Sequence, residues 1–175
     1  MSRMEVGEVY EASTGALEAA KGPRLSLRRA LNDFEDALAV PSLGRAADWA
    51  SRLTAVLEHL QTVWTVHVEV TEGPGGLYEE ILENTPRMAN MIDRFTREHA
   101  TIARAIDAAM ARLREAPDGD VAGEEGLRDG EEGLRDGEEG LRDGLVRLFA
   151  DLVRHRKRGL DLVYEAYHVD IGGES

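Results

Sequence analysis

The 175-residue chain has no cysteine, which excludes a disulfide framework and thiolate metal chemistry. Any metal site must therefore use histidine nitrogens and carboxylate oxygens, a ligand set that suits iron, manganese or zinc. The chain also lacks long apolar runs. Its first twenty residues therefore contain no signal-like segment, and no later stretch could span a bilayer. We therefore expect a cytoplasmic protein of one domain, large enough to bury a core.

Basic charge is scarce as well, with 21 Lys and Arg against 34 Asp and Glu and a formal net charge of −13. Such a surface repels phosphate backbones and anionic lipids, so we predict neither a nucleic-acid nor a membrane partner. The one basic run lies at residues 154–158. On a helix these cations spread around more than half of the circumference, which indicates a solvated, salt-bridged face.

Apolar residues recur at alternating steps of three and four, the spacing of one helix face, which we call the seam. Residues 1–22 lack such a period and end at Gly22-Pro23, so they are interpreted as a loosely attached N-terminal arm before a bundle over 23–170. Breaks at Pro41, at Gly73–Gly76 and before Pro117 separate the helices. The predicted helices cover about 27–38, 43–72, 86–116 and 145–169, with a short turn of helix at 77–82. The pattern predicts an all-α, antiparallel up-down four-helix bundle.

The heptapeptide GEEGLRD occurs three times in succession over residues 123–143. Each copy has one Leu, too few for a coiled-coil seam, and each glycine costs a helix about 1 kcal/mol. We therefore predict a flexible or weakly helical acidic loop between the third and fourth helices of the bundle, without chemistry of its own.

Three of the five histidines replace an apolar residue on the seam: His67, His99 and His155. Each is on a different helix, and the seams of facing helices project into one shared interior, where bundles build metal sites. Burying three imidazoles without partners would cost on the order of 1–3 kcal/mol for each unsatisfied group. The pattern therefore favours a shared metal site, while His59 and His168 are predicted to lie on the surface.

Carboxylates should complete the metal shell. We expect Glu72, just before the glycine break, as a ligand and rank Asp161 behind it, whereas Glu98 is predicted to face solvent. Gly159 lies one helical turn after His155. Its missing side chain indicates either a small cavity for dioxygen or water, or a close contact between helices.

These residues resemble the hemerythrin-like (HHE cation-binding) domains. The segment from His67 to Glu72 before a loop, Glu98-His99 on the third helix and His155 with Asp161 on the fourth are similar to that family's motifs. The resemblance implies non-heme iron, mono- or dinuclear, that binds or senses oxygen, peroxide or nitric oxide. The family's first-helix His has no counterpart over residues 25–38, so a five-His di-iron site is not expected.

We expect a binding or sensing protein rather than an enzyme, with a peroxide- or oxygen-reactive iron site as the catalytic alternative. A homodimer is left open as an assembly. Two other functions compete with metal binding. His155 to Gly159 matches the His-x-x-basic-Gly pattern of histidine-phosphotransfer domains, in which the His is exposed. The other is a metal-free helical interaction domain.

Overall fold

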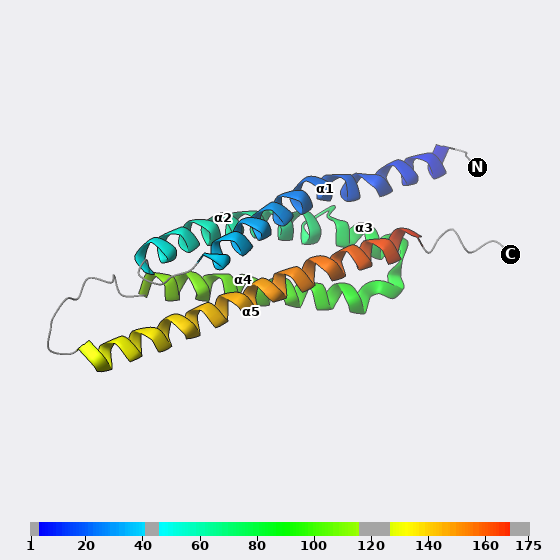
Figure 1. Cartoon of the computed structure of the whole chain (residues 1–175). Coiled ribbons are helices and arrows are strands. Elements are labelled where there is room, and N and C mark those ends of the chain that lie inside the picture. The colour runs from blue at the N-terminus through cyan, green and yellow to red at the C-terminus, as the bar shows by residue number, and fades with distance from the viewer. Residues whose placement is uncertain (1–3, 41–45, 116–126, 169–175) are drawn as a thin grey trace.

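The computed structural model describes residues 4–40, 46–115 and 127–168, with side chains described for 15–40, 47–115 and 139–167. Its elements are α1 (Met4–Ala39), α2 (Ala46–Glu72), α3 (Leu77–Asn84), the 3-10 turn η1 (Pro86–Met88), α4 (Ala89–Glu115) and α5 (Leu127–His168). The helices α1, α2, α4 and α5 pack antiparallel (Figure 1), so the predicted up-down bundle is confirmed. Among the described residues, no helix has an apolar stretch long enough to cross a membrane.

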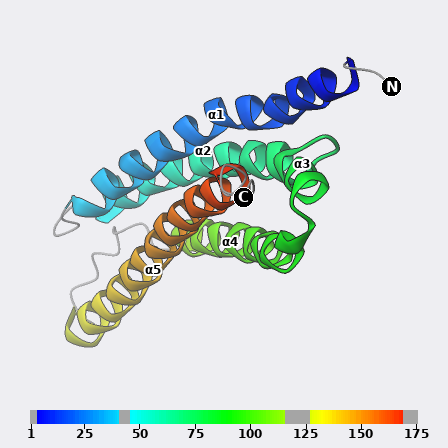
Figure 2. The ribbon, with the colours of Figure 1, turned by 90° about the vertical axis from the view of Figure 1, so that its right-hand side faces the viewer.

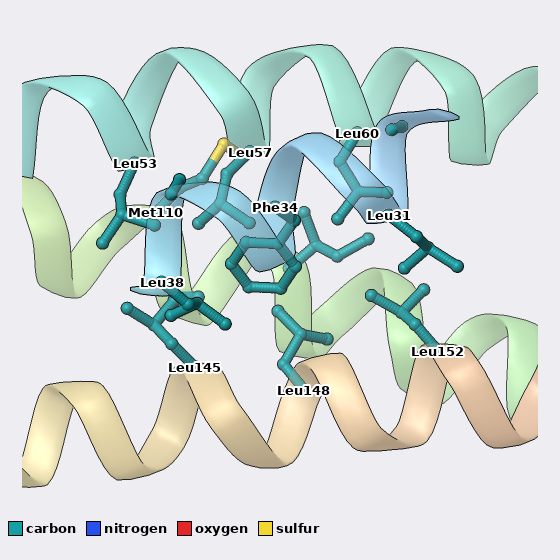
Figure 3. Packing of buried hydrophobic residues seen from close by; sticks show 14 of the residues in the cluster. Leu31, Phe34, Leu38, Leu53, Leu57, Leu60, Met110, Leu145, Leu148 and Leu152 are labelled. Carbon is teal, nitrogen blue, oxygen red and sulfur yellow. The ribbon is translucent and has the colours of Figure 1, made fainter. Parts of the chain in front are cut away.

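The main core lies among α1, α2, α4 and α5. Figure 3 shows Phe34 near its centre, with leucines of α1, α2 and α5 around the ring. Every predicted seam residue of α2 and α4 with a described side chain is buried, which confirms the 3-4 stepping of both helices. These residues are Leu53, Leu57, Leu60, Trp64, His67 and Thr71 on α2, and Met88, Ile92, Phe95, His99, Ile102, Ile106, Ala109 and Leu113 at η1 and α4.

A second, smaller core lies at the end of the bundle near α3, where α1 begins and α5 ends (Figure 1). Its buried members include Ala20, Leu77, Ile81, Phe95 and Leu162. Figure 2 shows α3 set across this end, between α2 and α4. The apolar interior of the bundle is thus divided into two parts, and this division positions the candidate site.

The predicted break after α2 is confirmed, and its glycines are required by geometry. Gly75 has a φ of 68°, a conformation that other residues rarely adopt. A Cβ on Gly73 would lie 2.5 Å from the Glu69 carbonyl oxygen, and one on Gly76 would lie 2.6 Å from the Gly73 carbonyl oxygen. The tight turn brings α3 back over the end of α2.

The predicted end of an arm at Gly22-Pro23 is wrong, because α1 is one helix from Met4 to Ala39 with Pro23 inside it. Proline removes a backbone donor and normally kinks or ends a helix. Here the residues before it are held by packing: Ala20 is fully buried in the second core, and the Ala16 backbone N–H donates to Glu80 Oε2 at 3.0 Å.

The repeats, predicted as a flexible or weakly helical loop, instead form part of a long helix from Leu127 onward, because α5 begins there and continues through the second and third copies. Residues 123–126 lie outside the described part. In the third copy Leu141 is buried in the main core, and Arg142 donates to the Leu38 carbonyl at 2.6 Å while stacking over Trp49. These tertiary contacts offset the helix cost of the glycines, a cost that a single-sequence argument weighs alone.

Candidate metal centre

His67, His99 and His155 form a buried polar layer between the two cores, with exposed fractions of 7%, 2% and 2%. On α2, α4 and α5 each histidine has main-core residues on one side along the helix and second-core residues of the bundle end on the other. The antiparallel order brings these three positions to one level. We call this group the histidine cluster.

The three rings turn their Nε2 atoms toward one another. His155 Nε2 lies 3.2 Å from His67 Nε2 and 3.2 Å from His99 Nε2, and the three ligand nitrogens all lie within 4.8 Å. With metal–nitrogen bonds of roughly 2.1 Å, nitrogens about 3.2 Å apart subtend roughly 100° at the metal, and no two can exceed roughly 4.2 Å. A movement of less than about 1 Å in one ring would therefore complete a three-nitrogen set.

Carboxylates lie at the outer nitrogen of two of these rings. Glu72 Oε1 is 2.5 Å from His99 Nδ1, and Glu98 Oε2 is 3.5 Å from His155 Nδ1. Glu98 also pairs with Arg158. The hydrogen bond to Glu72 favours the His99 tautomer with its proton at Nδ1, which leaves the Nε2 lone pair free, as in carboxylate–histidine–metal triads. The charge of Glu98 favours the same tautomer of His155 without a hydrogen bond. Two such lone pairs 3.2 Å apart repel unless a proton or a cation lies between them.

The cluster disfavours protonation. Burial lowers the pKa of His67 from 6.5 to about 3, with His99 and Arg24 adding to the effect. Burial likewise lowers the pKa of His99 to about 4, and burial with the neighbouring His99, His67 and Arg158 lowers that of His155 to about 2. Neutral imidazole is the form that binds metals, so the site is ready for a cation at neutral pH.

Aromatic side chains hold the rings in place. The Trp64 ring contacts all three imidazoles, with centroids 5.2 Å from His67, 5.3 Å from His99 and 5.1 Å from His155. Tyr78 of α3 stacks on His99 at an angle of 12°, and its hydroxyl lies 3.3 Å from His99 Nε2. Burial, with Glu72 nearby, raises the pKa of Tyr78 above its ordinary value. Among the described residues, His67 Nδ1 and His155 Nδ1 find no hydrogen-bond partner, so Glu98 acts on His155 through its charge and not through a hydrogen bond.

The structure brings together the three predicted histidines. Neither of the two predicted carboxylates, Glu72 and Asp161, joins the histidine Nε2 atoms. Glu72 contacts the outer nitrogen of His99, and Asp161 is exposed and outside the group that could share an ion. The prediction that Glu98 faces solvent is wrong, because its side chain is 21% exposed and reaches His155 across the helix interface. His59 is exposed, as predicted, and the His168 side chain lies outside the described residues.

A cavity of about 380 Å³ opens beside the cluster, and His67, Tyr78 and His155 form part of its wall. Gly159 also lines it, and a Cβ built there meets no atom within 4 Å. A close helix contact at Gly159 is thereby excluded, and the alternative of a cavity at this glycine is supported. Dioxygen, peroxide or water would have space next to the histidines.

The phosphotransfer alternative is contradicted, because His155 is 2% exposed and points into the bundle, whereas phosphotransfer requires an exposed histidine. Comparison with known proteins adds no assignment: the chain matches no protein-family model, no curated protein and no solved structure. The functional argument therefore depends on the geometry of the cluster.

Proposed function

We propose that the protein binds one metal ion through His67 Nε2, His99 Nε2 and His155 Nε2, and that a small ligand reaches this ion from the adjoining cavity. The observation that carries the proposal is the convergence of three buried, neutral imidazoles, two of them with a carboxylate at the outer nitrogen. A core built for stability alone would gain more from apolar side chains at these positions.

One ion, rather than two, agrees best with the donors present. Among the described residues, only these three histidines form a group whose ligand atoms could share an ion. The Glu72 carboxylate is hydrogen-bonded to His99 Nδ1 and would hold that ring with its Nε2 lone pair inward. Glu98, 3.5 Å from His155 Nδ1, would favour the same orientation of His155 through its charge. Three protein ligands leave coordination positions open for an external molecule.

Imidazole nitrogens suit iron, copper, nickel and zinc, and the resemblance to hemerythrin-like domains selects non-heme iron among them. When bound, such an iron would supply reversible binding of oxygen, nitric oxide or peroxide. The chain's own contribution is a buried site with aromatic walls that keeps its imidazoles neutral. A ligand would reach this site through the cavity beside Gly159. Binding and sensing fit this arrangement better than turnover of a large substrate.

The test is metal analysis of untagged protein, produced with iron supplied and measured by plasma mass spectrometry. We expect about one metal ion per wild-type chain and loss of nearly all of it in His99→Ala and His155→Ala. His59→Gln is the matched control, because it removes an exposed histidine of α2 without touching the cluster.

Circular dichroism of each variant separates loss of the metal from loss of the fold. Metal content far below one per chain that is equal in wild type and His99→Ala would refute the proposal. Zinc or copper in place of iron at the same three histidines would retain the site and refute the iron assignment.

A further inference from the structure

The cavity beside the histidine cluster has a wall whose charge is opposite to that of the protein. Four cationic side chains line it, Lys21, Arg24, Arg28 and Arg156, and none of the carboxylates among the described side chains does. In a chain with 34 acidic and 21 basic residues, a wall drawn at random would carry more acids than bases. The cavity therefore presents a local positive field within an acidic protein.

Arg24 is the cation best placed to bind a ligand. It lies on α1 between Ala20 of the second core and Leu27 of the main core, which sets it at the level of the histidine cluster. Its guanidinium is half-buried beside Tyr78 and Tyr167, and burial lowers its pKa while leaving it charged. Among the described residues, no carboxylate forms an ion pair with it. A partly desolvated guanidinium without an anionic partner is expected to bind one.

The remaining wall is apolar. Leu27, Leu77 and Leu162 are buried at its base, whereas Leu25 and Leu160, with exposed fractions of 49% and 52%, stand at its rim. The volume of about 380 Å³ falls at the lower end of the roughly 300–1,000 Å³ usual for small-molecule sites. Gly159 keeps the space open, because any larger residue there would extend into it.

We propose that this cavity binds a small organic carboxylate with an apolar body, its carboxylate paired with Arg24 and its chain lying against the leucines toward Leu25 and Leu160. Arg28 and Arg156 would raise the rate of capture through their charge. A planar guanidinium binds a carboxylate with two parallel hydrogen bonds, which distinguishes this ligand class from neutral molecules of the same shape. The proposal does not require a metal at the histidine cluster.

Octanoate is the probe, with octan-1-ol as its neutral counterpart, and calorimetry on metal-free and metal-loaded protein measures Kd. We expect octanoate to bind both forms, and octan-1-ol to bind at least tenfold more weakly. Arg24→Gln should raise the octanoate Kd at least tenfold, and Arg24→Lys should raise it less because the charge remains. Arg29→Gln is the matched control, since Arg29 is an exposed arginine of the same helix outside the cavity.

Gly159→Leu tests the volume without touching a charge. It should abolish octanoate binding while the thermal midpoint is kept or raised, since a helical glycine is replaced and no neighbour lies within 4 Å of its Cβ. Equal affinity for octan-1-ol, full binding in Arg24→Gln, or binding only to the metal-loaded form would each overturn the proposal. Octanoate binding by metal-free protein that never takes up metal would support it while the metal assignment failed.

Discussion

Acidification of the metal-free protein should destabilise it steeply, because the three cluster histidines are neutral when folded and protonated when unfolded. Their folded pKa values of about 3, 4 and 2 lie below the ordinary 6.5. Below about pH 6.5 the unfolded chain binds more protons than the folded one. The free energy of unfolding therefore decreases as the pH is lowered. The stability that these groups contribute is complete above the unfolded pKa and is lost as pH falls from about 6.5 through the folded values of about 4 for His99, 3 for His67 and 2 for His155.

The magnitude follows from proton linkage at about 1.4 kcal/mol per pH unit for each histidine. Between about pH 7.5 and pH 5 this amounts to about 2 kcal/mol for one histidine and about 6 kcal/mol for three. Since small proteins have only about 5–15 kcal/mol in total, the metal-free protein should lose much of its stability near pH 5. Glu72 acts in the opposite direction. Burial raises its pKa, so the folded chain takes up the Glu72 proton at a higher pH than the unfolded chain, and protonation of Glu72 stabilises the folded state.

Urea titrations at several pH values, followed by circular dichroism, measure this dependence on chelator-treated protein. His155→Leu should lose about 2 kcal/mol less than wild type over the same pH interval, because one buried imidazole is gone. The exposed His59 supplies the control, and His59→Gln should follow the wild-type curve. Identical pH dependence in wild type and His155→Leu would refute the claim that the cluster is held neutral by the fold.

Three further outcomes follow from packing and from the outer ligands. Gly159→Ala should stabilise the protein by about 1 kcal/mol in urea, because the helix gains and the new methyl meets nothing; a loss of stability would contradict the open cavity. Leu57→Ala, in the fully buried main core, should cost about 2–5 kcal/mol in the same assay, and a cost below about 1 kcal/mol would contradict that packing. Glu98→Gln should weaken metal binding about 10–100-fold in a competition titration with a chromophoric chelator, and unchanged affinity would exclude an orienting role for Glu98.

The sequence predicts the helix faces well because the 3-4 stepping reports directly which side of a helix is apolar. His67, His99 and His155 were identified as cluster members since each interrupts such a face, and the up-down topology then aligns them. The confirmed turn at Gly73–Gly76 follows from equally local chemistry, because a Cβ at Gly73 or Gly76 would collide with the backbone. Signals confined to one helix or one turn were sufficient for these elements.

Contacts between helices were not predictable in the same way. Glu98 occupies a position on α4 that points away from the seam, yet its long side chain reaches His155 on α5. Helical periodicity gives the direction of a Cα–Cβ bond and no information on which side chain a neighbouring helix places within reach. The same limit applies to Leu141, whose repeat carries too few apolar residues for a seam but contributes one leucine to the main core.

The position of α1 at the histidine layer brings these arguments together. The residues of α1 between the two cores are 21–26, and among them Arg24 lines the cavity at the level of the histidine cluster. An arginine cannot bind a metal, but its partly desolvated positive charge attracts an anion whether or not the histidines hold a metal ion. In the sequence, Gly22-Pro23 predicts the end of an arm, and nothing there indicates that Arg24 lies beside the histidines. Since α1 continues through Pro23, Arg24 lines the cavity, and its charge is the reason to expect an anionic ligand there.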